Sequence, residues 1–462
     1  MTPAFAASAH PSRALHVVAS DDLPMWLARQ PAHWHAWLAG QNFDAALGET
    51  RLLPGADGAV EAAVTGFGSA KSRARTRFGV ARALQSLPAG NWHLDGVLTA
   101  AQRDEAALAA LLASYRFDRY RPGKTAQPQA MLKAPEGCDC ARLIAMATGE
   151  FLTRDLINTP SSDMGPAELE AAFLALAAQF NAKTEVIRGD DLIAQNFPMI
   201  HAVGRASTRA PRILSLRWGA KGPRLTLVGK GVCFDTGGLD IKPSAGMLLM
   251  KKDMGGAATV MGLAHMIMAL NLPIQLRVIV PAVENAISGN AMRPSDILTS
   301  RKGLTVEINN TDAEGRLILA DALAWADEEA PDAIISMATL TGSARVAVGP
   351  DLAPFYTDDD AFAEALSAAA PGACDPVWRM PFWDAYEAMI EPKIADLDNA
   401  PAGSFAGSIT AALFLRRFVS CPRYMHFDIY GHTPSDAPAR PRGGVGQGAR
   451  ALLAALPKVL GL

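Results

Sequence analysis

A short segment of the chain, Asn310–Arg316 with the sequence NTDAEGR, carries two carboxylates and a guanidinium at alternate positions. In an extended backbone this spacing places Asp312, Glu314 and Arg316 on one face. Two carboxylates that face one point repel each other, so they need a cation between them or one of them must bind a proton. The segment therefore predicts a cation site or a carboxyl group with a raised pKa. The structural alternative is a solvated turn in which Glu314 caps a helix.

This charged segment lies between two predicted elements. Leu304–Ile308 has the composition of a β-strand, and the apolar spacing of Leu317–Ala326 predicts a helix. Strand-to-helix turns often carry functional side chains in α/β folds, because these turns gather at one edge of the sheet. We therefore expect the three charges at such an edge.

Two further charged stretches lie upstream. The chain reads KGVCFDTGGLDIKPS from Lys230 and MKKDMGGAA from Met250. By itself, Lys230 in a glycine turn is an ordinary surface lysine. A nucleotide-binding loop at Gly229–Gly231 is excluded, because neither the P-loop pattern nor the dinucleotide-binding pattern is present there.

Together with the NTDAEGR segment, these stretches resemble the leucine aminopeptidase family, the two-metal exopeptidases whose signature is this loop. The resemblance is clear from about Asp155 to about Val419 and is weaker beyond. The positions that match the family's motifs are Lys230, Asp235, Lys242, Asp253, Asp312, Glu314 and Arg316.

The resemblance implies two divalent metal ions that hold a water molecule between them. One ion would be bound by Lys230, Asp235, Asp253 and Glu314. The other would share Asp235 and Glu314 and add Asp312, including its backbone carbonyl. A lysine coordinates only when it is neutral, and a nearby dication can remove its proton.

The charges of these residues are consistent with a two-metal centre. Four carboxylates could not stay ionised together in a cleft, and two dications would balance them. Oxygen ligands suit Zn²⁺, Mn²⁺ or Mg²⁺, so the ligand types do not fix the metal. None of the nine histidines falls in these motifs, and the H-E-x-x-H pattern of many zinc proteases is absent.

The family resemblance also implies roles for two further cations. Lys242 would stabilise the substrate's carbonyl oxygen as it becomes an oxyanion. Arg316 would hold a bicarbonate ion that takes the proton of the attacking water, since every nearby carboxylate is a metal ligand. The adjacent Lys251 and Lys252 are expected to be solvated.

The substrate-binding residues are predicted on two segments. Met250 suits an adaptable apolar pocket for the substrate side chain, although a plain core position is the alternative. In the family, the loop that begins at Thr339 holds the substrate backbone, here through the Leu340 carbonyl and the Gly342 amide. The segment His426–His432 departs from the family pattern, which leaves the far wall of the pocket open.

Length and composition indicate the number of domains and the class of protein that carries these motifs. A chain of 462 residues is too long for one core, so two domains are expected. The net charge of −3 gives no sign of a nucleic-acid surface. Five scattered cysteines argue against a disulfide framework and favour a reducing cytoplasm, and Cys138 and Cys140 are expected to be ordinary thiols.

The predicted fold is α/β. A small N-terminal α/β domain covers residues 1–125, a linker and a bridging helix cover 126–160, and a catalytic domain covers 161–462. The near-continuously apolar runs Arg212–Trp218, Arg224–Gly229, Gln275–Val283 and Ala333–Leu340 predict strands that are buried on both faces. They indicate an α/β/α catalytic domain with a mixed, largely parallel central sheet.

The sequence thus predicts a metal-dependent aminopeptidase that releases N-terminal, preferably apolar and leucine-like, residues from peptides. A narrow dipeptidase, such as a Cys-Gly hydrolase on the same centre, is one alternative. A DNA-binding role, seen in some family members, is another, and the lack of a basic stripe argues against it. The resemblance also implies a homo-hexamer.

Overall fold

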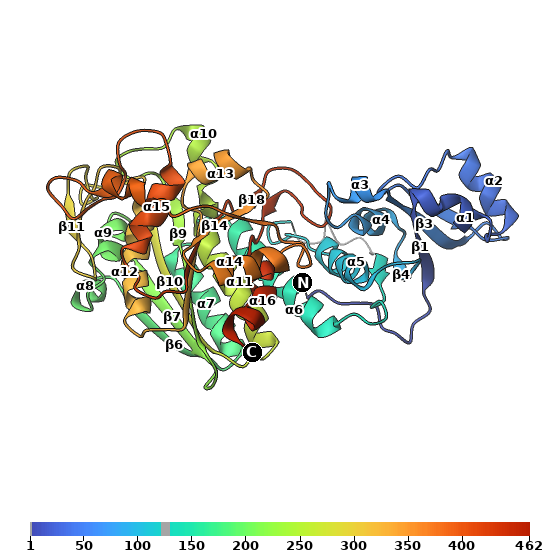
Figure 1. Ribbon diagram of the computed structural model, residues 1–462, viewed down its shortest axis with the longest axis horizontal. Helices are drawn as coiled ribbons and strands as arrows, with labels where there is room; N and C mark the ends of the chain where they lie inside the picture. Colours follow the sequence, from blue (N-terminus) through green and yellow to red (C-terminus); the bar gives the residue numbers. More distant parts are fainter. Residues whose placement is uncertain (1, 122–129) are drawn as a thin grey trace. The chain divides into compact units, whose positions relative to one another are not determined.

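A computed structural model describes residues 2–121 and 130–462, which form two compact units (Figure 1). The smaller unit comprises Met1–Phe151 and Ser435–Arg442, and the larger comprises Leu152–Pro434 and Gly443–Leu462. The division falls inside helix α6 (Cys140–Asn158). Of the linker and bridging helix predicted at 126–160, residues 126–129 lie outside the described residues.

The smaller unit contains a five-stranded sheet in which only β2 and β3 pair antiparallel. The sheet order is β2 (Thr50–Pro54), β3 (Val60–Gly68), β1 (Arg13–Ala19), β4 (Gly90–Asp95) and β5 (Ala130–Leu132). The helices of this unit are α1 (Leu23–Leu27), α2 (Ala32–Gly40), α3 (Ala70–Arg73), α4 (Val80–Ser86) and α5 (Ala100–Ala113), after the 3₁₀ turn η1 (Ser20–Asp22). Helices α4 and α5 pack against each other and against β5.

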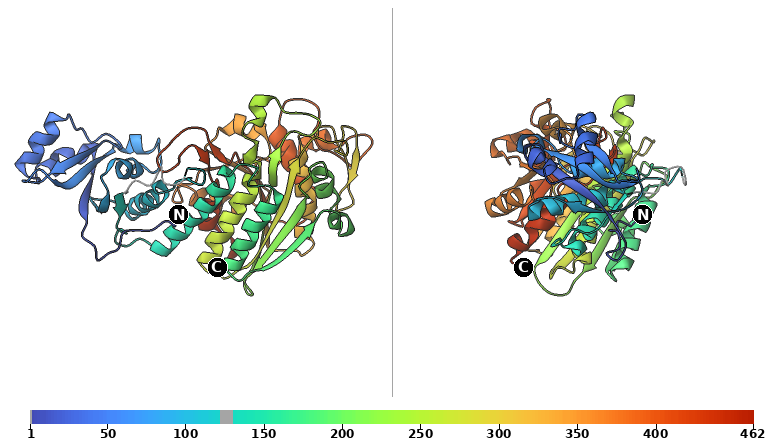
Figure 2. Two further views of the ribbon diagram at one scale, coloured as in Figure 1. Left: turned by 180° about the vertical axis from the view of Figure 1, so that it is seen from behind. Right: turned by 90° about the vertical axis from the view of Figure 1, so that its right-hand side faces the viewer.

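The larger unit is built on a nine-stranded mixed sheet (Figure 2). Its order is β15 (Val377–Arg379), β14 (Ala353–Thr357), β17 (Tyr424–Asp428), β13 (Ala333–Ala338), β8 (Arg224–Gly229), β10 (Gln275–Asn285), β7 (Arg212–Trp218) and β6 (Lys183–Arg188), with β9 (Gly231–Asp235) on the end of β10. The central strands β17, β13, β8 and β10 are parallel, and β9 continues this direction. Strands β14, β6 and β7 introduce antiparallel pairs.

Helices cover both faces of this sheet, so that the unit has three layers. One face carries α7 (Pro166–Gln179), α11 (Gly255–Ala269), α14 (Asp360–Ala369) and α16 (Ala449–Leu460). The other face carries α9 (Pro198–Gly204), α12 (Glu314–Asp327) and α15 (Gly407–Arg416). The remaining elements are short: α8 (Asp191–Ala194), α10 (Ser244–Met247), η2 (Met250–Met254), α13 (Gly342–Val348), η3 (Asp384–Ile390), β11 (Ile297–Thr299), β12 (Thr305–Glu307), β16 (Leu397–Asp398), β18 (His432–Thr433) and β19 (Gly443–Gly444).

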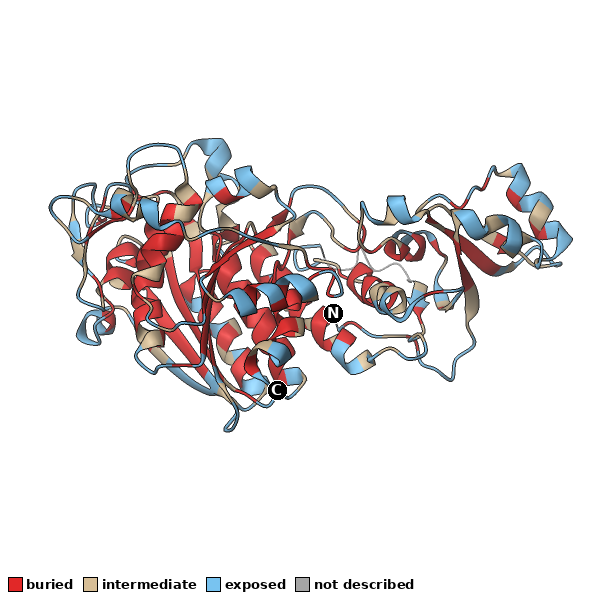
Figure 3. Ribbon diagram, in the orientation of Figure 1, coloured by how far each residue is buried: buried red, intermediate tan, exposed pale blue. Residues whose placement is uncertain are grey.

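The central strands are buried nearly throughout, as Figure 3 shows. All six residues of β13 are buried, because helices α11 and α12 cover its two faces. Burial on both faces explains why these strands have near-continuous apolar sequences. The predicted α/β/α architecture with a mixed, largely parallel sheet is confirmed.

None of the five cysteines forms a disulfide within the described residues. Within residues 2–121 and 130–462, no helix combines the length and the apolar character that crossing a bilayer requires.

Candidate metal centre and substrate cavity

The candidate residues lie at one edge of the large sheet, where its neighbouring strands end. Strands β17, β13, β8 and β10 run parallel, so their carboxyl ends lie together. The residues at or directly after these ends are Asp428, Thr339, Lys230 and Asn285, and β9 ends at Asp235 beside Asn285. This edge is the place where the sequence predicted the charged residues.

Three carboxylates converge at this edge. Carboxylate oxygens of Asp235, Asp312 and Glu314 lie within 4.8 Å of one another. Both oxygens of Glu314 are buried and accept no hydrogen bond from the described residues. Asp312 lies in the turn before α12, and Glu314 is the first residue of that helix.

Lys230 joins this group to the fourth predicted carboxylate. Its Nζ lies 2.7 Å from Asp253 Oδ2 and 3.0 Å from Glu314 Oε1. The side chain reaches them by passing Gly315, where an added Cβ would lie 2.4 Å from Lys230 Cε. Glycine at position 315 is therefore a steric requirement of this arrangement.

Lys242 contacts the other two carboxylates. Its Nζ forms ion pairs with Asp235 Oδ2, at 2.8 Å, and with Asp312 Oδ1. The five predicted metal ligands and Lys242 are thus brought together in one cluster, in which two lysines face four carboxylates.

The electrostatics of the cluster indicate a deficit of positive charge. Burial and repulsion from Asp235 raise the pKa of Glu314 to about 8 and that of Asp312 to about 6. Burial also raises the pKa of Asp253, whereas the neighbouring lysines outweigh burial at Asp235 and lower its pKa. Buried carboxylate oxygens that accept no hydrogen bond from the described residues, together with raised carboxyl pKa values, are typical of groups that bind dications, so these residues fit divalent metals.

A loop held by a buried carboxylate borders the cluster. Thr339 Oγ1 donates to Asp253 Oδ1 at 2.8 Å and so orients that carboxylate. Asp428 Oδ1 accepts the backbone N–H groups of Leu340 and Thr341 at 3.1 and 2.9 Å, and its Oδ2 accepts the Thr341 hydroxyl. Asp428 therefore fixes the loop that the sequence assigned to substrate binding.

A cavity of about 380 Å³ opens beside the cluster. Met250 lines this cavity and is half-buried, so it is available to a ligand and is not a core residue. Thr339, Leu340 and Gly342 line it as well. The predicted substrate-binding residues therefore share one cavity with the metal-ligand candidates.

Two family models match this chain. Residues 151–453 match the cytosol aminopeptidase family, catalytic domain, and residues 14–135 match the M17 aminopeptidase, N-terminal domain.

The chain belongs to the cytosol aminopeptidase family.

Similar proteins agree with the family assignment. A probable cytosol aminopeptidase of Roseiflexus castenholzii is 40% identical over 75% of this chain and 74% of its own length. The crystal structure of the cytosol aminopeptidase from Coxiella burnetii covers 98% of both chains at 42% identity and a TM-score of 0.93. The bottromycin maturation enzyme BotP in complex with Mn is 30% identical, with a TM-score of 0.87 over 97% of this chain and 99% of BotP. Family membership makes this chain a metal-dependent aminopeptidase, a hydrolase.

Arg316 differs from the sequence expectation. Because α12 begins at Glu314, Glu314 and Arg316 are on a helix and not on an extended strand, so their side chains point in different directions. Glu314 converges with Asp312, and Arg316 does not join them. Arg316 lines a separate cavity of about 550 Å³ with Asn310 and Phe405. Its side chain is buried, and its Nε has no hydrogen-bond partner among the described residues.

The two neighbouring lysines of η2 also differ from expectation. Lys252 is 7% exposed and lines the substrate cavity, so the prediction that it is solvated is wrong. Burial lowers its pKa to about 8, an effect that Asp253 partly offsets. Lys251 is half-buried and donates to the Asn158 carbonyl at 2.6 Å.

Several supporting residues of this cytosol aminopeptidase site were not found from sequence. Asn285 Nδ2 donates to Asp235 Oδ1 at 2.9 Å and to the Thr311 carbonyl at 3.1 Å, which ties two ligand loops together. Asp240 accepts the Thr311 N–H at 2.7 Å from the other side. The available signal was the position of Asn285 and Asp428, each a polar residue at the end of an apolar strand.

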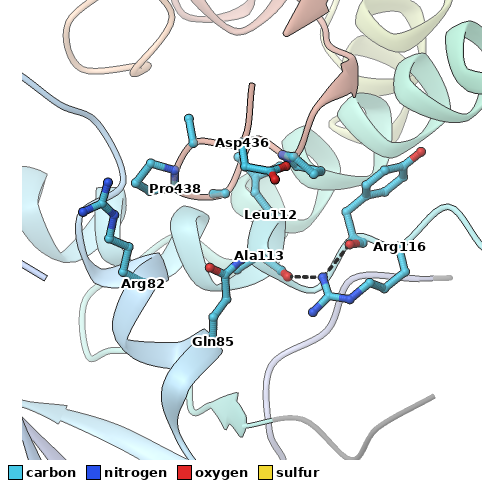
Figure 4. A pocket seen from close by; sticks show the side chains of 11 residues that line it. Arg82, Gln85, Leu112, Ala113, Arg116, Asp436 and Pro438 are labelled. Atoms are coloured by element: carbon cyan, nitrogen blue, oxygen red, sulfur yellow. Dashed lines mark hydrogen bonds between the residues drawn. The ribbon is translucent and has the colours of Figure 1, made fainter. Parts of the chain in front are cut away.

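The smaller unit has a cavity of its own, shown in Figure 4. It is lined by α4, the end of α5 and the segment Ser435–Arg442, with Arg82, Arg116 and Asp436 as its charged residues. The Arg116 guanidinium is engaged by the carbonyls of Ala113 and Tyr115 at 2.9 and 2.7 Å. This cavity therefore lacks the carboxylate cluster that characterises the edge of the large sheet.

Proposed function

We propose that this chain removes N-terminal residues from peptides with the help of two divalent metal ions. The ions would be held by Lys230, Asp235, Asp253, Asp312 and Glu314. The observation that carries the proposal is the buried carboxylate cluster, in which the Glu314 oxygens accept no hydrogen bond from the part of the chain that the structure describes. When bound, two such ions would activate a water molecule between them and polarise the scissile carbonyl.

Lys242 and Arg316 are proposed to act on negative charge that develops during the reaction. Lys242 is the more exposed of the two lysines in the cluster and also lines the cavity, so its ammonium can reach a substrate oxygen. It would donate to the carbonyl oxygen as that oxygen gains charge. Arg316, whose buried Nε has no hydrogen-bond partner among the described residues, would hold a bicarbonate ion, which would supply the general base for the attacking water.

The loop at Thr339 would orient the substrate backbone. Asp428 occupies the N–H groups of Leu340 and Thr341, so the Leu340 carbonyl and the Gly342 amide are the groups of this loop offered to the peptide. Holding the reacting bond in one orientation lowers the entropic part of the barrier.

The experiment that tests the proposal compares a peptide that has a free amino terminus with its N-acetylated form. The free amine would bind in the cluster as a neutral ligand, so acetylation should abolish cleavage by the metal-loaded protein. Equal rates for the two peptides would show that the chain is not an exopeptidase.

Finer features of the proposal come from similar proteins. The solved structure of BotP is a complex with Mn, which supports manganese here, with zinc or magnesium as the other candidates. The word "cytosol" in the relatives' names supports a cytoplasmic location, in line with the sparse cysteines. The homo-hexamer stays a prediction, and light scattering that finds a fully active monomer would refute it.

A further inference from the structure

The substrate cavity is lined by a lysine that forms no ion pair with the described residues. Lys252 is 7% exposed and its ammonium lies 4.9 Å from the centre of the Tyr430 ring. Because Lys252 lines the cavity, its ammonium is available to a ligand that carries negative charge.

A second cation faces the same aromatic ring. The guanidinium of Arg345, on α13, lies 4.9 Å from the centre of the Tyr430 ring. Arg345 is exposed, lines the same cavity and forms no ion pair with any residue of the described ranges. The two cations repel each other, and one aromatic ring compensates each only weakly.

The nearest carboxylates are already engaged elsewhere. Asp253 accepts hydrogen bonds from Lys230 and Thr339 and is a proposed metal ligand. Asp428 is saturated by the loop that it fixes and by the Ser408 hydroxyl at 2.8 Å. The part of the cavity wall around the Tyr430 ring therefore presents two cations.

The rest of the cavity wall has a different character. Leu249, Met250, Leu340 and Ile429 line it together with the metal-ligand candidates Lys230, Asp235, Asp253 and Asp312. A ligand whose amine binds at the carboxylate cluster would thus share this cavity with apolar side chains and with two cations. An amino-acid side chain with methylene groups and a carboxylate offers a partner to both.

We propose that this cavity selects peptides whose first residue is acidic, glutamate or aspartate, with the side-chain carboxylate bound by Lys252 and Arg345. This inference rests on the proposed aminopeptidase function and specifies its substrate class. It differs from the leucine-like preference that the family resemblance implies, and the difference comes from Lys252, Arg345 and Tyr430. Met250 would pack against the methylene groups of the bound side chain.

The test uses tripeptides that differ only in the first side chain, Glu-Ala-Ala, Gln-Ala-Ala and Leu-Ala-Ala, all with amidated C termini. Glutamine matches glutamate in size, and amidation makes the side chain the only carboxylate. The metal-loaded wild-type chain should show a kcat/KM for the Glu peptide about 10- to 100-fold above that for the Gln peptide, as expected for loss of a charged hydrogen-bond partner.

The variants Lys252→Met and Arg345→Met should each reduce this Glu-to-Gln ratio at least severalfold, while the control Lys251→Met should preserve it. Lys251 is a suitable control because it belongs to the same 3₁₀ turn and points to the Asn158 carbonyl instead of the cavity. Should Lys252→Met fail to fold, Arg345→Met decides, because Arg345 is exposed.

Two results would overturn the inference. One is equal or faster cleavage of the Gln and Leu peptides by the wild type, and the other is a Glu-to-Gln ratio that both cavity variants leave unchanged. A preference for carboxylates that appears only with a free C terminus would also overturn it, because the bound group would then be the end of a short peptide. Failure of the proposed function itself is distinguishable, since none of the peptides would then be cleaved.

Discussion

His426, on β17 beneath the site, should make the stability of the large unit sensitive to mild acid. The ring is fully buried, its Nδ1 lies 2.9 Å from Ser336 Oγ, and its Nε2 has no partner among the described residues. Burial, with a smaller contribution from the nearby Arg316, lowers the pKa of His426 from 6.5 to about 3. The folded chain therefore keeps this imidazole neutral at pH values where the unfolded chain protonates it.

The magnitude follows from proton linkage. Well above pH 6.5 the His426 ring is neutral in both the folded and the unfolded chain, so its burial does not lower the free energy of unfolding. As the pH falls from 6.5 towards 3, the unfolded state binds a proton that the folded state excludes, and stability is lost. Each pH unit below 6.5 lowers the free energy of unfolding by ~1.4 kcal/mol. At pH 5, about 1.5 units below 6.5, the loss is about 2 kcal/mol.

The assay is urea unfolding at pH 7 and pH 5, followed by tryptophan fluorescence, for the wild type and for His426→Phe. Phenylalanine keeps an aromatic ring against Tyr356, whose ring centre lies 6.1 Å away, but cannot titrate. Between pH 7 and pH 5, the free energy of unfolding should fall by about 2 kcal/mol less in His426→Phe than in the wild type. The same loss in both proteins would refute the reasoning, and His201→Gln, at a half-buried histidine beside Asp190, is the control that should behave as wild type.

Three further predictions concern the reaction. Lys242→Met should lower kcat by roughly 10²–10³ in steady-state kinetics, as for loss of one oxyanion donor, and an unchanged kcat would remove its assigned role. Arg316→Ala should keep its metal content by elemental analysis but lose kcat, and added bicarbonate should stimulate the wild type more than the variant; equal stimulation would exclude an anion at Arg316. Asp428→Ala should cost about 2–4 kcal/mol of stability in urea unfolding and lower kcat, because the Leu340 and Thr341 amides lose their shared acceptor; a fully stable, fully active variant would show that Asp428 does not fix the loop.

The central strands could be predicted because their burial on both faces is visible in their own sequences. Arg212–Trp218 and Arg224–Gly229 coincide with β7 and β8, since a strand buried on both faces must be apolar along its whole length. The start of α12 could not be predicted in the same way. Its first turn, Glu314–Arg316, is polar and contains a glycine, and the reason for this glycine, the approach of Lys230 from a distant strand, is seen only in the folded chain.

The burial of Lys252 could not be predicted from the sequence either. Two adjacent lysines are a polar pattern, and the sequence gives no indication that one faces a cavity and the other the Asn158 carbonyl. The difference arises from the 3₁₀ turn η2 and from Tyr430, which is distant in the chain. The ligand candidates were predictable by comparison because family motifs retain them, whereas Asn285 and Asp428 act through hydrogen bonds that only the assembled sheet edge creates.

Metal binding tests the central claim most directly. Wild-type protein and Glu314→Gln, both stripped with a chelator, would be titrated with Mn²⁺ and the bound metal measured by elemental analysis after gel filtration. The account predicts two equivalents per chain in the wild type and at most one in Glu314→Gln, because the Glu314 carboxylate lies between the other ligands. Two full equivalents in both proteins, or none in a wild type that still cleaves peptides, would contradict it.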